Sequence, residues 1–132
     1  GHGRTESGEK IRIGANVMKS FITTHVLDTM RGKPAAGITV ALEMAGTSKE
    51  WTKISSGTTG HDGRINDLFP DGIPPEKGAY RLTFDTGPYF RSIQVESFYP
   101  YVQIVFHVKE SSVHYHVPLL LSPFGYSTYR GS

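Results

Sequence analysis

The sequence contains no cysteine, so the chain forms no disulfide and offers neither a thiolate nucleophile nor a cysteine-ligated zinc site. It also lacks a cluster of basic residues. Its 14 basic and 12 acidic residues are spread along the chain, which argues against nucleic acid as a partner. Long apolar runs are missing too. The longest, Val102–Phe106 and Val117–Leu121, fall far short of the ~20 residues that a membrane-spanning helix needs.

A chain of 132 residues is expected to form one domain around one hydrophobic core. Residues 1–20 are polar with scattered apolar side chains. We expect them to be a flexible N-terminal extension that begins with a cloning remnant, Gly1–Gly3. The character of the sequence changes at Phe21, and the folded domain is expected to span residues 21–132.

From Phe21 onward, short β-branched and aromatic segments alternate with turn residues such as Gly, Pro and Asp-Gly. In Ala79–Asp85, for example, Tyr80, Leu82 and Phe84 share one face, as in a half-buried strand. A short helix is expected only at Gly87–Gln94. The pattern predicts an all-β fold, an antiparallel β-sandwich. Its strands are expected at Phe21–Asp28, Ile38–Met44, Trp51–Thr59, Arg64–Leu68, Ala79–Asp85, Tyr101–Val108, His114–Leu121 and Phe124–Tyr129.

The histidines are the main candidates for chemistry. His2 belongs to the remnant, His61 to a Gly-His-Asp-Gly turn, and His107 to the polar face of its strand, so none of them indicates a site. His25 interrupts a β-branched strand, where a partly buried structural role is the simpler interpretation if it is taken alone. Imidazole nevertheless exchanges protons near neutral pH, which keeps His25 a candidate.

His114 and His116 alternate with Tyr115 and therefore point to the same face of a strand. Two such histidines can ligate zinc, but no third ligand stands at motif spacing, so a metal site is not predicted. The chain then ends in an aromatic-rich segment followed by Arg130-Gly131-Ser132. A well-ordered end of this kind can hold the Ser132 hydroxyl and carboxylate in place, or it can simply finish an edge strand.

Several motifs together resemble the transthyretin-related 5-hydroxyisourate hydrolase family. They follow the family's order and cover the chain from about Thr23 to Ser132, and the last two are highly specific. They are Thr23–Asp28, the Asp62-Gly63-Arg64 turn, Phe98–Val102, His114–Pro123, and the closing Tyr-Arg-Gly-Ser at 129–132.

The resemblance implies a transthyretin-like (prealbumin-like) sandwich of about eight strands with one short helix. It also implies a homotetramer, a dimer of dimers whose active sites lie in the clefts between dimers. The implied reaction is hydrolysis of 5-hydroxyisourate, the product of urate oxidation, to a ureidoimidazoline carboxylate. No metal and no organic cofactor is implied, and neither nucleic acid nor a membrane is expected as a partner.

Carried over position by position, the resemblance implies the catalytic residues His25, Arg64, His116 and Ser132. Arg64, Arg130 and Ser132 would bind the substrate. One histidine would take a proton from the attacking water while Arg64 offers a fixed positive charge. Which histidine is the base stays open. A serine nucleophile is disfavoured because Ser132 stands in no Gly-x-Ser-x-Gly motif.

Two other interpretations stay open at this point. One is a transthyretin-like carrier of a small aromatic ligand without catalysis, and the other is a β-sandwich interaction module. The histidines, Arg64 and the closing tetrapeptide favour the hydrolase over both. Localisation stays undecided between peroxisome and cytoplasm, because neither a signal peptide nor a closing Ser-Lys-Leu is visible.

Overall fold

The computed structural model describes residues 12–13, 16–17 and 20–132. Near the N-terminus, β1 (Arg12–Ile13) pairs antiparallel with β2 (Asn16–Val17). The rest of the extension expected over residues 1–20, apart from Ser20, lies outside the described residues. In the described part of the chain, no helix is both long and apolar enough to cross a membrane.

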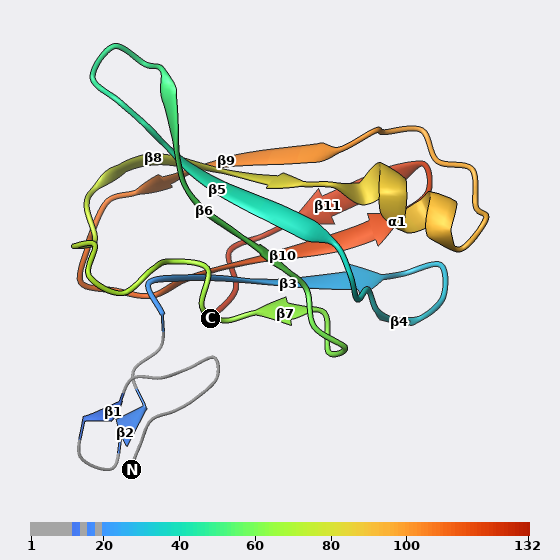
Figure 1. Cartoon of the computed structure of the whole chain (residues 1–132), viewed down its shortest axis with the longest axis horizontal. Helices are drawn as coiled ribbons and strands as arrows, with labels where there is room; N and C mark the ends of the chain where they lie inside the picture. The colour runs from blue at the N-terminus through green and yellow to red at the C-terminus, as the bar shows by residue number, and fades with distance from the viewer. Residues whose placement is uncertain (1–11, 14–15, 18–19) are drawn as a thin grey trace.

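One sheet has the strand order β11-β10-β3-β4, and β7 pairs with the same edge of β3 as β4 does (Figure 1). Its central strands β3 and β10 run parallel, from Tyr115 opposite Ile22 to Leu121 opposite Asp28. The sheet therefore joins segments from the two ends of the folded domain. Its strands are β3 (Ile22–Asp28), β4 (Lys33–Pro34), β7 (Arg64–Ile65), β10 (Tyr115–Ser122) and β11 (Gly125–Thr128).

The second sheet has the order β6-β5-β8-β9 and is antiparallel throughout. A register shift between Leu42 and Glu43 marks a bulge where β5 meets β6. The outer strands β6 and β9 each keep one unpaired edge within the described chain. The strands of this sheet are β5 (Thr39–Ala45), β6 (Trp51–Thr58), β8 (Gly78–Phe84) and β9 (Val102–Val108).

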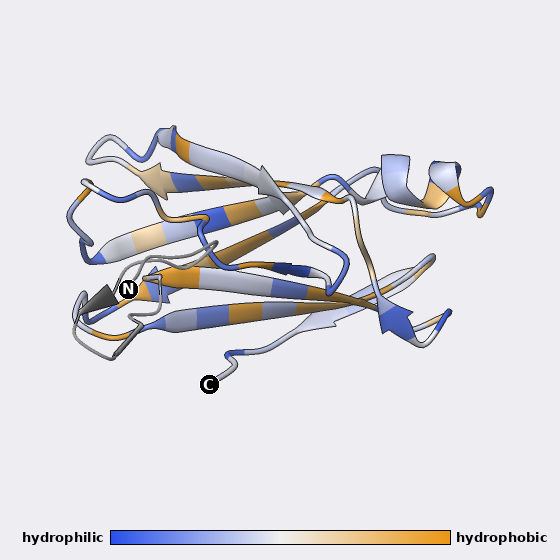
Figure 2. Ribbon diagram, turned by 60° about the horizontal axis from the view of Figure 1, so that its bottom comes forward, coloured by the Kyte–Doolittle hydropathy of each residue, from blue (hydrophilic) through white to orange (hydrophobic). Residues whose placement is uncertain are grey.

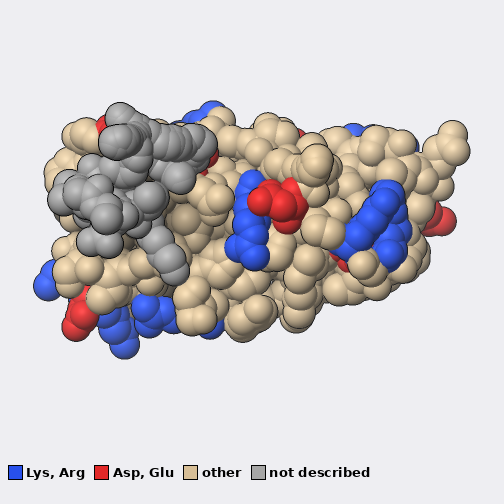
Figure 3. Space-filling view, turned by 90° about the horizontal axis from the view of Figure 1, so that it is seen from below, with Lys and Arg blue, Asp and Glu red and all other residues tan. Residues whose placement is uncertain are grey.

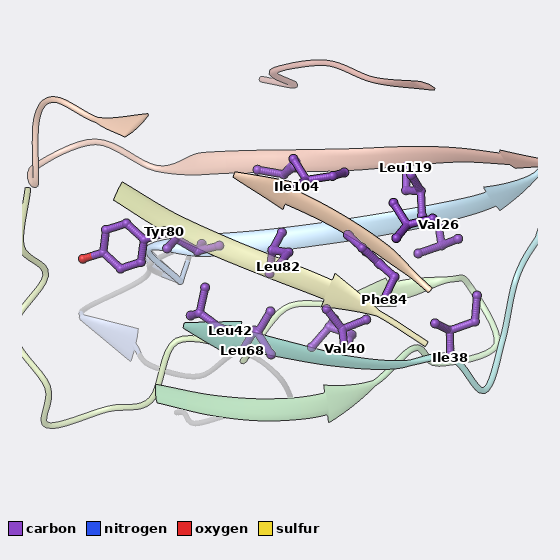
Figure 4. Packing of buried hydrophobic residues seen from close by; sticks show 14 of the residues in the cluster. Val26, Ile38, Val40, Leu42, Leu68, Tyr80, Leu82, Phe84, Ile104 and Leu119 are labelled. Carbon is purple, nitrogen blue, oxygen red and sulfur yellow. The ribbon is translucent and has the colours of Figure 1, made fainter. Parts of the chain in front are cut away.

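The two sheets pack face to face, as the ribbon of Figure 2 shows, and apolar side chains of both sheets point into the space between them (Figure 4). Val26 and Leu119 of the first sheet meet Leu82 and Phe84 of the second, and all four are fully buried. Each such side chain stabilises the fold by about 1.5–3 kcal/mol relative to leaving it exposed. Packing of the core against one face of β3 and β10 holds the backbones of these two strands in place. It therefore also sets where the side chains on their other face begin.

The single helix of the described domain, α1 (Thr86–Ser92), follows β8 and buries Tyr89 and Phe90. The Tyr89 hydroxyl donates a hydrogen bond to Oδ2 of Asp28 at the end of β3, at 2.6 Å. Asp28 is fully buried, and its Oδ1 accepts a second hydrogen bond from the Arg31 backbone at 2.9 Å. The helix is therefore tied to the end of the strand that carries His25.

The predicted β-sandwich with one short helix is confirmed, with the parallel β3–β10 pair as its one departure from an antiparallel arrangement. The predicted strand at Arg64–Leu68 is too long: it ends at Ile65, because Leu68 leaves the sheet and fills the core from a loop. Lys33–Pro34, which is not among the predicted strands, forms a short strand that pairs back onto Leu27 and Asp28.

Candidate functional site

Alternation along β3 and β10 sorts their side chains onto the two faces of one sheet. Val26 of β3 and Val117 of β10 point into the core, whereas the neighbouring His25 and His116 are only partly buried on the opposite face. We call this opposite face the outer face. It carries Thr23, His25, His114 and His116, together with Arg64 from β7.

Thr23 links the two histidines of the His-Tyr-His segment. Its Oγ1 lies 2.8 Å from Nε2 of His114 and 2.8 Å from Nδ1 of His116, its register partner. The two imidazole rings stack with their centroids 6.2 Å apart. His114, left outside the core site on sequence grounds, thus lies against His116. Thr23 went unnoticed because a threonine is ordinary in a β-branched strand.

Arg64 lies beside His25 because the two residues are direct partners in the antiparallel β3–β7 pair. Paired residues project their side chains from the same face of a sheet. The turn before β7 holds this register: Gly63 accepts a hydrogen bond from the Val26 backbone at 2.8 Å and donates one to Gly60 at 2.8 Å. Gly63 has φ +77°, and a Cβ there would collide with the Val26 carbonyl oxygen. Only glycine fits this turn.

The surroundings of His25 lower the pKa of its imidazole below the usual 6.5. Burial is the main cause, because it penalises the charged form, and the positive charge of Arg64 acts in the same direction. A hydrogen bond with the Asp62 backbone and the Asp62 charge oppose the shift. His25 is therefore neutral at neutral pH and can accept a proton.

The chain segment after β11 continues along β10 in the same register. Leu119 is opposite Thr128, and three residues further His116 is opposite Gly131. The ladder is interrupted between them because Pro118 has no N–H to donate. The Pro118 carbonyl accepts a hydrogen bond from the Thr128 hydroxyl instead, at 2.7 Å.

Gly131 brings this terminal segment against the His116 ring. Its backbone N–H donates to the His116 carbonyl at 2.8 Å, and a Cβ at this position would lie 2.6 Å from Cδ2 of His116. The segment therefore passes so close to the imidazole that a side chain does not fit. Ser132 follows directly and is exposed.

Arg130 lies on the opposite side of β10 from His116. Its guanidinium lies 4.5 Å from the centroid of the Tyr115 ring, a cation–π contact. Tyr115 belongs to the core face of β10, which is opposite to the face of His114 and His116. Within one chain, Arg130 is thus separated from the other predicted site residues.

The structure brings His25, Arg64 and His116 onto one face, with Gly131 against His116 and Ser132 next in the chain. His61 and His107 are exposed and take no part in this arrangement. Among the described residues, no group of three or more His, Cys, Asp or Glu side chains is arranged to hold a metal ion. The outer face therefore combines groups that move protons with one fixed positive charge.

Basic and acidic side chains are interspersed on the side of the molecule that lies lowest in Figure 1. Seen from below, in Figure 3, blue and red groups lie at several places with uncharged surface between those places, and near the centre a blue and a red group adjoin. The part of this view that is not covered shows no continuous basic stripe of the kind that follows a phosphate backbone.

A family model and individual proteins of known name point to the same family. The model of the HIUase/Transthyretin family matches residues 22–131. A mouse (Mus musculus) protein named 5-hydroxyisourate hydrolase is 45% identical over 115 residues, which cover 86% of this chain and 96% of the mouse protein.

Solved structures of both kinds of family member resemble the chain. The 5-hydroxyisourate hydrolase of Klebsiella pneumoniae superposes with a TM-score of 0.73 and 38% identity, over 86% of this chain and all of that one. Sea bream transthyretin in complex with thyroxine gives a TM-score of 0.78 and 31% identity, over 85% of this chain and 95% of that one. The backbone alone therefore does not distinguish a hydrolase from a carrier.

Proposed function

Since the chain belongs to the HIUase/transthyretin family, we propose that the outer face of its β3–β10 sheet is the active site of a 5-hydroxyisourate hydrolase. The activity is that of an enzyme of urate degradation. The observation that carries the site assignment is the meeting of His25, Arg64 and His116 on one sheet face. The three residues lie far apart in the sequence, on β3, β7 and β10, and strand pairing brings them onto one face.

In the proposed reaction, water attacks a carbonyl carbon of the lactam ring. One imidazole takes a proton from this water as the new C–O bond forms. The ring C–N bond then breaks, and the leaving nitrogen receives a proton from an imidazolium. The products are an N–H group and a carboxylic acid, which releases its proton to solvent and becomes a carboxylate, so one water molecule has been added. The lowered pKa of His25 supports a neutral imidazole at this position at neutral pH, and both His25 and His116 are candidates for the base.

Arg64 is the proposed electrostatic partner of the substrate. It is exposed on the outer face, and its guanidinium offers paired donors to oxygens that gain negative charge. A donor of this kind is typically worth ~3–4 kcal/mol in the transition state. Ser132 and Arg130 share the binding role in this proposal. For Arg130, this requires its guanidinium to leave the Tyr115 ring.

Ser132 orients water or substrate in this mechanism and does not act as a nucleophile. Direct attack by water needs no acyl intermediate, and Ser132 follows Gly131 at an exposed position without a nucleophile elbow. Trapping a covalent adduct at Ser132 during turnover would contradict this part of the proposal.

We also propose that the enzyme assembles as a homotetramer. In the described chain, β9 and β11 each end a sheet with an unpaired edge, and Val105 and Tyr126 on these strands are 59% and 42% exposed. Open, apolar strand edges invite pairing with another chain. Analytical ultracentrifugation at micromolar concentration tests this: the expected species has the mass of four chains, and a monomer would refute it.

The alternative, a carrier of a small aromatic ligand, is supported by the likeness to thyroxine-bound sea bream transthyretin. The higher identity to proteins named 5-hydroxyisourate hydrolase favours catalysis. The presence of His25, Arg64 and His116 on the outer face favours it too. A carrier would need none of them to move protons.

The decisive experiment generates 5-hydroxyisourate from urate with urate oxidase and follows its decay by ultraviolet absorbance. We expect the protein to accelerate the decay, and no acceleration over buffer would overturn the proposed function. Single-turnover rates of His25→Ala and His116→Ala then test the site. Chemistry at the wild-type rate in either variant would remove that residue from the mechanism.

A further inference from the structure

One threonine hydroxyl touches both histidines of the His-Tyr-His segment. Thr23 is only 5% exposed although it lies on the outer face. Its Oγ1 is 2.8 Å from Nε2 of His114 and 2.8 Å from Nδ1 of His116. A hydroxyl has a single proton to donate, whereas each neutral imidazole has one donor and one acceptor nitrogen. The position of the hydroxyl proton of Thr23 and the tautomers of His114 and His116 are therefore coupled.

Building on the proposed function, we infer that Thr23 is a positioning residue that fixes the tautomer of His116. In the arrangement we assign, Nδ1–H of His116 donates to Oγ1 of Thr23, and the Thr23 hydroxyl donates to Nε2 of His114. The proton of neutral His116 is then on Nδ1 and its lone pair is on Nε2. Nε2 is the nitrogen that accepts the proton of the attacking water.

This arrangement needs no rearrangement during catalysis. When Nε2 of His116 takes the proton, the ring becomes an imidazolium in which both nitrogens donate. Nδ1–H keeps its hydrogen bond to Thr23, so the hydroxyl does not have to rotate. The opposite arrangement, in which Thr23 donates to Nδ1, would put the proton of neutral His116 on Nε2 and leave no lone pair there for the water.

The surroundings hold the ring in the required orientation. Thr23 contacts the ring at Nδ1, and the backbone at Gly131 passes along the edge at Cδ2. Charged or titratable groups that the structure also places on this face include His25, two residues further along β3, and Arg64 beside it. Thr23 is the side chain whose hydroxyl oxygen lies within hydrogen-bonding distance of a nitrogen of each ring.

The experiment compares Thr23→Val, which keeps the shape and removes the hydroxyl, with Thr23→Ser, which keeps the hydroxyl. We expect Thr23→Val to lower kcat by about 10- to 100-fold with little change in KM. This is at or below the lower end of the ~10²–10⁴-fold that a general base contributes, because the variant disturbs the tautomer of the base and leaves the base in place. Thr23→Ser should recover most of kcat. The matched control is Thr24→Val, which removes a buried hydroxyl whose hydrogen bond goes to the Val117 carbonyl on the core side. It should leave kcat unchanged.

A second readout is independent of activity. Long-range ¹H–¹⁵N correlation spectra of the wild-type protein distinguish the two neutral tautomers of His116. We expect the proton on Nδ1 in the wild type and in Thr23→Ser, and a mixture in Thr23→Val. A wild-type His116 protonated on Nε2 would overturn the inference even if Thr23→Val failed to fold. Unchanged kcat in a folded Thr23→Val would overturn it as well. If the wild type did not hydrolyse 5-hydroxyisourate, the proposed function would fail while the tautomer could still be measured.

Discussion

At the scale of single residues, the environment of His25 is the clearest case of a fold that changes how readily a side chain binds a proton. Its pKa is lowered by burial first and by Arg64 second. We predict that Arg64→Gln raises this pKa toward 6.5, because the variant removes the positive charge that disfavours imidazolium. Titration of the His25 ring protons by NMR measures the shift. An unchanged pKa would assign the whole effect to burial.

The second residue-scale prediction concerns Gly131. In Gly131→Ala the new methyl group would lie 2.6 Å from Cδ2 of His116, so the terminal segment or the ring has to move. We expect kcat/KM to fall by at least about tenfold, since a misplacement of about 1 Å in a catalytic group can cost 10²-fold. The melting temperature should change little. Gly125→Ala is the control, because its nearest neighbour would be 3.8 Å away. Equal activity of the two variants would contradict the prediction.

Residues of the site differ in how visible they are in the sequence. His25, Arg64, His116 and Ser132 were found through family motifs, and the first three do meet on one face. Thr23 was missed because its hydrogen bonds reach 91 and 93 residues along the chain, and no local pattern encodes such a distance. The contact of Arg130 with Tyr115 was missed because it depends on how the segment after β11 packs against β10, which no sequence pattern states.

At the scale of elements, the turn between β6 and β7, residues 59–63, places Arg64 beside His25. We predict that Gly63→Ala is more destabilising than Gly72→Ala, although both glycines have positive φ. Alanine at either position pays for left-handed backbone, about 1–2 kcal/mol. A Cβ at Gly63 also meets the Val26 carbonyl, whereas nothing lies within 4 Å at Gly72. Urea denaturation measures the difference. Equal free energies of unfolding for the two variants would show that the turn accommodates the Gly63→Ala methyl group without further destabilisation.

The tie between α1 and β3 gives a prediction with a definite pH dependence. Burial and the hydrogen bond to Asp28 raise the pKa of Tyr89 from 10 to about 12. Because the folded-state pKa is the higher one, this contribution to stability is complete below pH 10. It is lost as the pH rises toward about 12. Tyr89→Phe should lose about 1.5–3 kcal/mol at neutral pH, the range for a hydrogen bond to a charged group. Thermal unfolding from pH 8 to 11 tests both statements.

In the variant, the part of the pH dependence that belongs to Tyr89 should disappear. A wild type and a Tyr89→Phe protein that lost stability in parallel above pH 10 would contradict the assignment. They would locate the titrating group elsewhere in the fold.

The longer strands were easier to predict from the sequence than the short strands that pair with them. Strict alternation identified the strand at Gly78–Phe84 to within one residue, because each inward side chain is buried in one core. The two-residue strands at Lys33–Pro34 and Arg64–Ile65 were not delimited, because a period of two needs more residues than they contain. Pro118 also stands inside a central strand, where proline is rare. It is tolerated because the β10–β11 ladder stops at Leu119 and Thr128, so the N–H that proline lacks is not needed there.

At the scale of the whole molecule, the predicted sandwich is confirmed, but the order of its strands could not be read from the sequence. Periodicity tells which face of a strand is buried and is silent about which strand lies next to it. The parallel pairing of β3 with β10 is the main consequence of that order, and it assembles the site.

The proposed tetramer gives the prediction at this scale. Val105 is 59% exposed on β9, an edge strand, and a charge there should prevent another chain from pairing with it. We expect Val105→Glu to sediment as a smaller species and to lose activity if the sites form between dimers. Thr52→Glu on β6, the opposite edge of the same sheet, is the control and should keep the wild-type mass. A Val105→Glu protein of wild-type mass would exclude β9 from the interface.

The long gap between β3 and β10 also bears on how the protein is made. Thr23 emerges from the ribosome 91 residues before His114. At ~5–20 residues per second, the edge of β3 that will receive β10 waits about 5–18 seconds for its partner. During this time the backbone N–H and C=O groups along that edge of β3 have no strand to pair with, even after the second sheet has been synthesised. Synthesis rate and chaperone supply would then set the yield of active enzyme, whatever the stability of the finished fold.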